Sequence, residues 1–271
     1  MHAVERLSLA IRHSRYLAQF DWIWDLIRPV YDRAVCVAGR SGLERVINET
    51  DHILIAPKFR SLNETYEPEM WQSLMNELRP ADVFVDVGVY IGLYTVAVGK
   101  RLGVAGRVYG FEPDPANYKH ALRHVELNSL SNRVKLVHAA VGERNERVHF
   151  KFAAEVGHIV SASESGTSAV DCVTLDQVFV GKKVDLLKID VEGYEEMVLA
   201  GGRTLLKDIT RCPRAIYIEV HPYAWPNVGT TSDSLLGLLN DSGYSVTTLQ
   251  NEPVTRIESY GEIIASKNTR P

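Results

Sequence analysis

The chain alternates short apolar runs with segments in which apolar residues recur at helical spacing. Runs rich in Val, Ile, Leu and Phe are typical of strands buried on both faces of a parallel sheet. The predicted strands are residues 83–87, 107–111, 133–141, 184–189, 215–220, 244–249 and 262–266. The predicted helices are residues 67–78, 93–102, 118–128 and 231–239. Strands that alternate with helices predict an α/β fold with a doubly wound, mostly parallel sheet.

The first part of the chain has a purely helical pattern. Between residues 3 and 35 the apolar positions follow a helical period that Pro29 interrupts, which predicts two amphipathic helices. Interleaved arginines and the neighbouring Trp22 and Trp24 are compatible with a peripheral membrane contact. We favour a helical cap or a homo-oligomer contact, because tryptophans at helical spacing belong more often to a core than to a membrane anchor.

A length of 271 residues fits one domain with an extension, or two small domains. No repeat and no interdomain linker divides the chain after about residue 66. Before that point, one strand is expected at residues 52–56. We therefore assign residues 1–65 to a helical N-terminal extension or cap. Residues 66–271 are assigned to the main domain.

Net charge, cysteine spacing and the length of apolar runs favour some classes of protein over others. The formal net charge of −4 gives no electrostatic reason to expect a nucleic-acid partner. Cys36, Cys172 and Cys212 are scattered, show no metal-binding spacing and suggest a reducing compartment. No apolar run approaches the roughly 18 residues that span a bilayer, and the charged N-terminus lacks the apolar region of a signal peptide. We expect a cytoplasmic protein.

The segment VFVDVGVYIGLYT, residues 83–95, has the pattern of a strand, a glycine turn and a helix. Gly88 and Gly92 bracket the turn, and Asp86 lies at the end of the strand. In an open parallel sheet such a turn places backbone N–H groups and a helix N-terminus beside a ligand. Glu112 ends the next predicted strand, where an acid can accept hydrogen bonds from both hydroxyls of a ribose. These residues predict a site for a ribose-bearing cofactor.

The glycine spacing separates the two obvious cofactors. A dinucleotide favours G-x-G-x-x-G, which is absent, so S-adenosylmethionine is the favoured cofactor. The glycines alone would equally suit a plain turn from strand to helix, but Glu112 outweighs that interpretation. His138 and Ala139, at the end of the third strand, are candidate adenine contacts, and a core histidine is the favoured alternative for His138.

Asp190, Glu192 and His221 follow two further strands at the sheet edge where ligands bind, with Glu219 just before His221. An alcohol that attacks a methyl sulfonium must lose its proton, and a carboxylate or an imidazole can take it. Acids and a histidine could also hold a divalent cation that lowers the pKa of the hydroxyl. We rank base catalysis above metal assistance and assign no metal ligand. Asp190 could instead cap the following helix.

Six blocks occur in the order DVGVYIGLYT, FEPDPANYKHALRHVELNSL, HAAVGE, TLDQ, VDLLKIDVEGYEEMVLAGG and IEVHP, and the match covers about residues 66–221. In this order they resemble the FkbM family of S-adenosylmethionine-dependent methyltransferases. The resemblance implies a class I methyltransferase (Rossmann-like) fold, with a seven-stranded sheet that ends in an antiparallel hairpin. It also implies O-methylation of a hydroxyl on a small molecule, a sugar, a glycan or glycolipid, or a natural product.

The family's functional positions fall on specific residues of this chain. The resemblance places Asp86, Gly88 and Gly92 in the cofactor loop, and Glu112 at the ribose. It places Asp190, Glu192 and His221 on the acceptor side. The full set of candidate cofactor contacts is Asp86, Gly88, Tyr90, Gly92, Glu112, Pro113, His138, Ala139 and Asp190.

One departure concerns the cofactor loop. Where the family commonly has Ala-Asn, this chain has Val89-Tyr90, so the asparagine contact is missing unless Tyr90 replaces it through its hydroxyl or by packing. This keeps open a non-catalytic homologue that binds the cofactor and acts as a scaffold. A NAD-dependent oxidoreductase is the other alternative, but the chain lacks G-x-G-x-x-G and a Tyr-x-x-x-Lys pair at the site.

Overall fold

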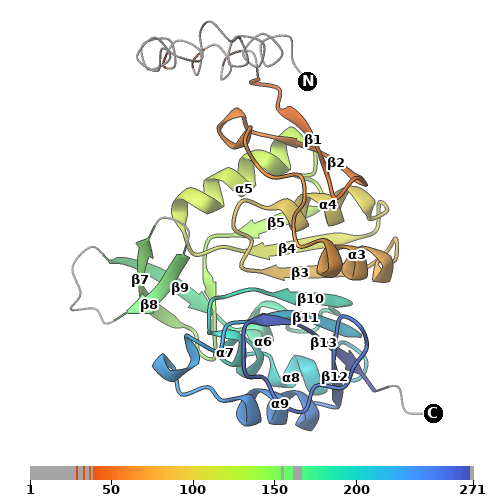
Figure 1. The fold of residues 1–271 in the computed structure, drawn as a ribbon, viewed down its shortest axis with the longest axis vertical. Helices are drawn as coiled ribbons and strands as arrows, with labels where there is room; N and C mark the ends of the chain where they lie inside the picture. The colour runs from red at the N-terminus through yellow and green to blue at the C-terminus, as the bar shows by residue number, and fades with distance from the viewer. Residues whose placement is uncertain are drawn as a thin grey trace, which may run out of the picture.

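A twisted seven-stranded sheet is the centre of the fold (Figure 1). The computed structural model describes residues 29, 33, 37, 39–153, 156–160 and 167–268. The strand order is β12-β13-β11-β10-β3-β4-β5, and the last two strands along the chain, β12 and β13, pair antiparallel. The bounds are β3 Val83–Val87, β4 Arg107–Phe111, β5 Val134–Val137, β10 Leu186–Ile189, β11 Ala215–Val220, β12 Tyr244–Thr248 and β13 Gly261–Lys267. The predicted class I methyltransferase fold, with its antiparallel hairpin, is confirmed.

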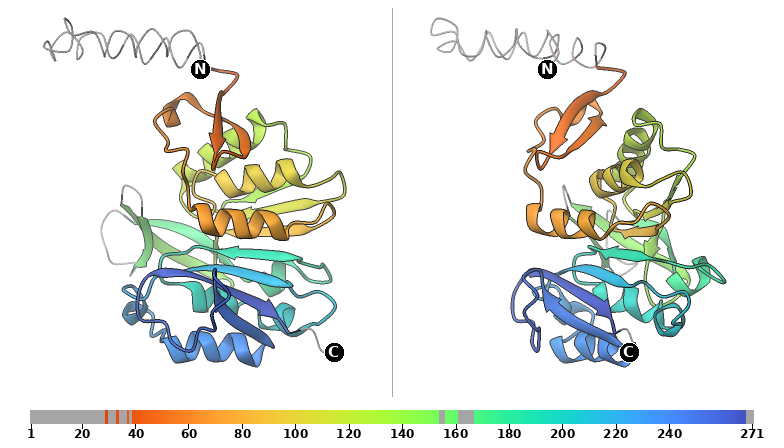
Figure 2. Two further views of the ribbon diagram at one scale, coloured as in Figure 1. Left: turned by 45° about the vertical axis from the view of Figure 1, so that its right-hand side comes forward. Right: turned by 90° about the vertical axis from the view of Figure 1, so that its right-hand side faces the viewer.

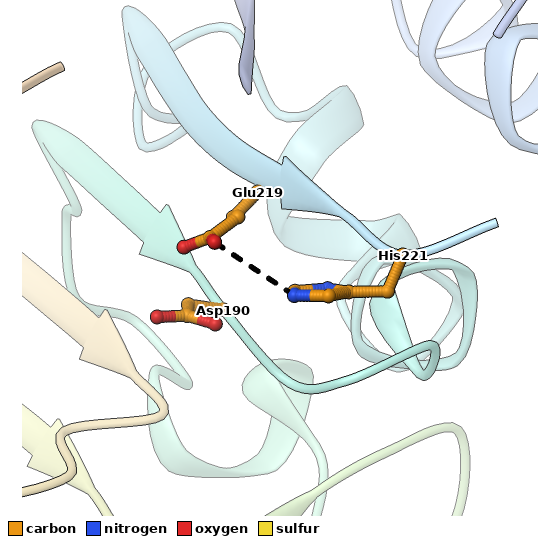
Figure 3. Close-up of side chains that lie close together, drawn as sticks. All are labelled: Asp190, Glu219 and His221. Carbon is orange, nitrogen blue, oxygen red and sulfur yellow. Dashed lines mark ion pairs between the residues drawn. The ribbon is translucent and has the colours of Figure 1, made fainter. Parts of the chain in front are cut away.

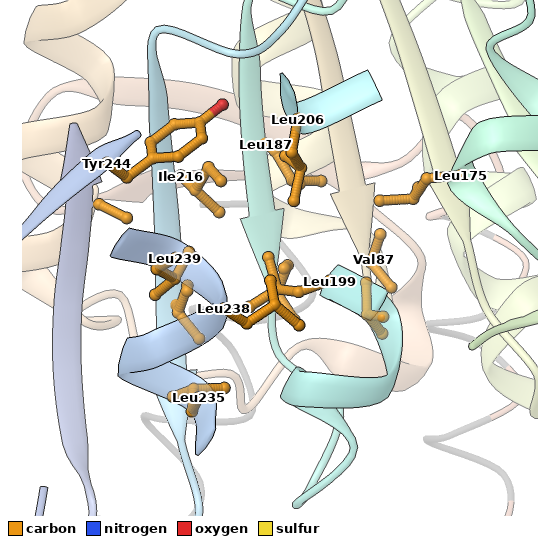
Figure 4. Close-up of a cluster of buried hydrophobic side chains, with 14 of the residues drawn as sticks. Val87, Leu175, Leu187, Leu199, Leu206, Ile216, Leu235, Leu238, Leu239 and Tyr244 are labelled. Atoms are coloured by element: carbon orange, nitrogen blue, oxygen red, sulfur yellow. The ribbon is translucent and has the colours of Figure 1, made fainter. Parts of the chain in front are cut away.

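Helices cover both faces of this sheet (Figure 2). Successive strand residues point to opposite faces, so Phe84 joins one core, while Val85 and Val87 join the other. Helices α3 Pro68–Glu77, α4 Leu93–Arg101 and α5 Pro115–Leu127 pack on the first face. Figure 4 shows part of the second core, which includes residues of α6 Leu175–Val178, α7 Glu195–Ala200, α8 Arg203–Lys207 and α9 Ser232–Asp241. Burial on both faces explains the continuous apolar runs in the sequence.

A second sheet extends from the end of β5. Its order is β6-β9-β7-β8, with bounds β6 Ala140–Val141, β7 Glu146–Ala153, β8 Val156–Val160 and β9 Ser168–Val173. Strands β7 and β9 pair antiparallel, in agreement with the alternating pattern of residues 147–152 and the strand-like run of residues 169–175. The predicted strand 133–141 is broken, because β5 ends at Val137 and Ala140 pairs instead with Cys172 of β9. His138 and Ala139 form the turn between the two sheets.

The segment before α3 is a β-hairpin, which corrects the expectation of a helical extension over its residues. Strands β1 Leu43–Ile47 and β2 Asp51–Ile55 pair antiparallel, and their buried residues join the core under α3 and α4. The Asp51 carboxylate accepts hydrogen bonds from Trp71 Nε1, at 2.8 Å, and from Arg101 Nε, at 2.6 Å. The strand expected at residues 52–56 is thus present as β2, while β1 was missed because a short strand with mixed burial carries little periodic signal. Buried residues of both strands belong to the core of the main domain.

Most of the predicted helices between residues 3 and 35, with the membrane and oligomer contacts expected of them, lie outside the described residues. Residues 29, 33 and 37 are helical. In the parts of the chain that the structure describes, no helix has the length and apolar character to cross a bilayer.

Candidate functional site

The glycine turn between β3 and α4 is wedged between two other segments. Gly88 has a φ of +89°, and a Cβ at this position would lie 1.7 Å from the Asp190 carbonyl oxygen, just beyond β10. Gly92 has a φ of +88°, and a Cβ there would lie 3.2 Å from Ala121 Cβ on α5. Both glycines therefore combine a left-handed backbone with a close approach, and the turn touches the backbone of a predicted acceptor-side residue.

Glu112 ties the glycine turn to the end of β4. Its Oε2 accepts a hydrogen bond from Tyr90 N at 2.7 Å, and its Oε1 accepts one from Asp114 N at 2.8 Å. Burial raises the pKa of Glu112 to about 7, although both backbone hydrogen bonds oppose the shift. Each carboxylate oxygen keeps a further lone pair, so the group can still accept hydrogen bonds from a ligand.

Asp86 lies beneath the turn rather than on its surface. Its side chain is buried, and Thr95 Oγ1 donates a hydrogen bond to Oδ2 at 2.6 Å. The other oxygen, Oδ1, is buried without a hydrogen-bond partner. Burial raises the pKa of Asp86 to about 6, because a charged carboxylate loses its hydration there.

The remaining candidate cofactor contacts differ in exposure. Tyr90 is exposed and has a φ of +52°, in the left-handed region. His138 is also exposed, so its interpretation as a core histidine is wrong. Its ring stacks on Tyr118, with centroids 5.1 Å apart, and its Nε2 donates a hydrogen bond to the Pro113 carbonyl at 3.0 Å. Ala139 is buried behind it. These contacts join the turn after β4 to the turn after β5.

Lys188 is a buried cation between the two halves of the site, and sequence reasoning missed it. The residue is only 2% exposed, with Nζ 3.0 Å from Asp190 Oδ2 and 4.7 Å from the centroid of the Tyr94 ring. Burial alone would lower the pKa of Lys188, but nearby carboxylates outweigh it and raise the pKa. These carboxylates are Asp190, Glu67, Asp86 and Glu219. A lysine inside the otherwise apolar run of β10 was the available signal.

His221 is oriented by a carboxylate that the sequence analysis did not select. Glu195, the first residue of α7, is 0% exposed, and its Oε1 lies 2.8 Å from His221 Nδ1. The Glu195 carboxylate also accepts hydrogen bonds from Gly193 N and Trp225 Nε1, each at 2.9 Å. Burial lowers the pKa of His221, but the Glu195 hydrogen bond and nearby carboxylates outweigh it and raise the pKa. His221 Nδ1 therefore carries a proton, and Nε2 faces away from Glu195.

Asp190, Glu219 and His221 come together at the carboxyl ends of β10 and β11 (Figure 3). One ligand atom from each of them lies within 4.8 Å of the others, and His221 Nε2 is 3.8 Å from Glu219 Oε1. Burial, with the charge of Asp190 adding to it, raises the pKa of Glu219 to about 7. The Tyr260 hydroxyl donates a hydrogen bond to Glu219.

Glu192 lies beside this group rather than in it. Its Oε2 is 3.6 Å from His221 Nε2 and accepts a hydrogen bond from the Tyr223 hydroxyl. The exposed rings of Tyr223 and Tyr260 lie 5.8 Å and 5.4 Å from the His221 ring. Asp190, Glu192 and His221 are therefore neighbours, as expected, but Glu219 replaces Glu192 in the central group.

One protein family and several solved structures are similar to this chain. A family model, the methyltransferase FkbM domain, matches residues 86–246. No curated protein matches the chain. Among solved structures, a putative rRNA methylase from Clostridium thermocellum is 10% identical, with a TM-score of 0.48 over 74% of this chain and 94% of that one. An O-methyltransferase from Bacillus cereus in complex with SAH is 12% identical, with a TM-score of 0.42 over 78% and 85% of the two chains.

Proposed function

The chain belongs to the FkbM methyltransferase family, and from that premise we propose that it methylates a hydroxyl group, with a sugar, glycan, glycolipid or natural product as the acceptor. The observation that carries this proposal is the contact between the two halves of the site. The glycine turn touches the backbone of Asp190, whose side chain meets Glu219 and His221. A methyl donor on the turn and a proton-accepting group would thus be neighbours.

The residues beside the turn fit S-adenosylmethionine. Gly88 leaves a space that a Cβ would fill, and Glu112 can accept hydrogen bonds from ribose hydroxyls. Two buried carboxylate oxygens, Asp86 Oδ1 and Glu67 Oε2, have no hydrogen-bond partner and suit the α-ammonium group of this cofactor. When bound, the cofactor supplies an electrophilic methyl group on a positively charged sulfur.

The acceptor side provides the groups that an attacking hydroxyl needs. Asp190, Glu192 and His221 are proposed to face the acceptor, to orient its hydroxyl and to remove its proton as the oxygen attacks the methyl carbon. Lys188 holds Asp190 through a 3.0 Å contact, and Glu195 holds the His221 ring. Two buried partners thus restrict the side chains that would contact the acceptor.

Binding of S-adenosylhomocysteine, measured by isothermal titration calorimetry, tests the cofactor assignment. We expect saturable binding of one molecule per chain, and no heat of binding with NAD⁺ under the same conditions. Binding of NAD⁺ alone would overturn the proposal in favour of an oxidoreductase. Binding of neither ligand would favour the scaffold homologue, with Tyr90 in place of the asparagine contact.

A Glu112→Gln variant is expected to weaken binding of S-adenosylhomocysteine by roughly 10–100-fold, the equivalent of one hydrogen bond to a charged group. A glutamine has one acceptor oxygen and so cannot serve both Tyr90 N and Asp114 N. In the unmodified protein, affinity should fall as the pH drops below about 7, because the carboxylate becomes protonated and loses its acceptor role.

The matched control is Glu126→Gln, on the exposed side of α5, where the carboxylate pairs with Arg123. This variant should bind S-adenosylhomocysteine as the unmodified protein does, at every pH. Unchanged affinity in Glu112→Gln would remove Glu112 from the cofactor site.

A further inference from the structure

The geometry points to a divalent cation site formed by Asp190, Glu219 and His221, and we propose it as part of the acceptor side. The three residues come from the ends of two adjacent strands and point toward one another (Figure 3). Their candidate ligand atoms lie within 4.8 Å of one another, a spacing that small adjustments convert into coordination of one ion. The inference rests on the proposed function only for what the ion would do.

The orientation of His221 is an observation independent of the acidic residues. The ring is nearly fully buried, Nδ1 donates to the buried Glu195, and Nε2 therefore lies toward Asp190 and Glu219, where the neutral imidazole would offer its lone pair to a cation. A histidine that ligates a metal almost always donates its other N–H to a carboxylate or carbonyl. Glu195 occupies this outer position, and two further hydrogen bonds, from Gly193 N and Trp225 Nε1, fix it in place.

The local charge also favours a cation. The carboxylates of Asp190, Glu67, Asp86 and Glu219 all lie within electrostatic range of the buried Lys188 ammonium group. Lys188 Nζ bonds to Asp190 Oδ2, which leaves Oδ1 for another partner. Carboxylates left without a counter-charge in a buried site are costly, and an ion held by two of them reduces that cost.

The donor set selects the class of ion. Two carboxylates and one imidazole suit Mn²⁺, Mg²⁺ and similar divalent cations that keep further positions for oxygen ligands. An acceptor hydroxyl bound at such a position would lose its proton more readily, because the cation stabilises the alkoxide. The proton could then pass to Glu192, whose Oε2 lies 3.6 Å from His221 Nε2, or to solvent.

Titration of the chelator-treated full-length protein with Mn²⁺, followed by electron paramagnetic resonance of the free ion, tests the site without knowledge of the acceptor. We expect one Mn²⁺ per chain, displaced by excess Mg²⁺. Glu219→Gln and His221→Asn should each weaken binding by at least about 100-fold, because each removes a ligand. Glu195→Gln should weaken it by roughly 10–100-fold, the usual cost of losing an outer-shell partner.

Glu262→Gln is the matched control, since Glu262 pairs with Glu219 across β13 and β11 but lies outside the group of three. This variant should change Mn²⁺ affinity by no more than a few-fold. Equal losses of Mn²⁺ affinity in Glu262→Gln and Glu219→Gln would mean that the ion responds to the overall negative charge of the region and not to specific ligands, and would overturn the site. Absence of Mn²⁺ binding by the unmodified protein would also overturn it.

Binding of S-adenosylhomocysteine, measured on the same preparations, separates the two proposals and checks that each variant is folded. Mn²⁺ binding without cofactor binding would leave the cation site standing and overturn the proposed function. Cofactor binding without Mn²⁺ binding would overturn the cation site and leave the proposed function standing, with His221 Nε2 as a candidate base.

Discussion

A Gly88→Ala variant should lose measurable binding of S-adenosylhomocysteine and about 4 kcal/mol or more of its free energy of unfolding, a range that single substitutions rarely reach. The new Cβ would lie 1.7 Å from the Asp190 carbonyl oxygen, whereas real Cβ contacts are essentially never under 3.0 Å. The two backbones would have to separate by about 1.3 Å, the difference between these distances. That displacement would also break the hydrogen bond from Asp190 N to Val87 O, which is 2.9 Å long.

Gly181→Ala is the control that separates backbone strain from steric overlap. Gly181 also has a positive φ, +66°, but a Cβ there would meet no atom within 4 Å. Its substitution should cost only the roughly 1–2 kcal/mol of a left-handed residue and leave cofactor binding intact. Urea unfolding and calorimetry on both variants give the comparison. Similar losses of stability in the two would show that the contact with Asp190 does not explain the glycine at position 88.

Local sequence signals explain why the glycine turn and the acid beside it could be predicted. The strand, the glycines at 88 and 92 and the acid at 112 are signals that can be recognised one at a time, because each depends on a local backbone requirement. The parallel sheet was predictable for the same reason, since strands buried on both faces leave uninterrupted apolar runs. Of the hairpin of β1 and β2 only the second strand was predicted, at residues 52–56, because strands of five residues with mixed burial carry little periodicity.

The acceptor side depends on contacts between distant segments. Glu195 is the first residue of α7, where the helix dipole favours any acid, whereas its partners His221 and Trp225 lie 26 and 30 residues away. Glu219 was recognised as adjacent to the site, but its place in the central group depends on the register of β11 against β10. Side-chain direction at the end of a strand follows from tertiary packing, which no local pattern encodes.

Lys188→Met should lower the free energy of unfolding by roughly 3–5 kcal/mol near pH 8, because it removes one partner of a buried ion pair and leaves the other charged. Methionine preserves the length and most of the volume of the side chain, so loss of packing contributes little. The loss should be smaller near pH 5. Asp86, whose pKa is already raised to about 6, is then protonated in the folded state, and that proton offsets part of the missing positive charge.

Lys183→Met provides the matched control, because Lys183 also pairs with an acid two residues ahead, in the same segment of the chain. Its Nζ lies 2.6 Å from Asp185 Oδ1, but its side chain is 60% exposed, against 2% for Lys188. An ion pair whose cation is exposed in this way contributes about 0–1 kcal/mol, with little dependence on pH in this range. Urea unfolding of both variants at the two pH values measures the difference. If Lys188→Met were no more destabilised than Lys183→Met, a cation other than Lys188 would have to balance Asp190, Asp86 and Glu219 in the folded protein.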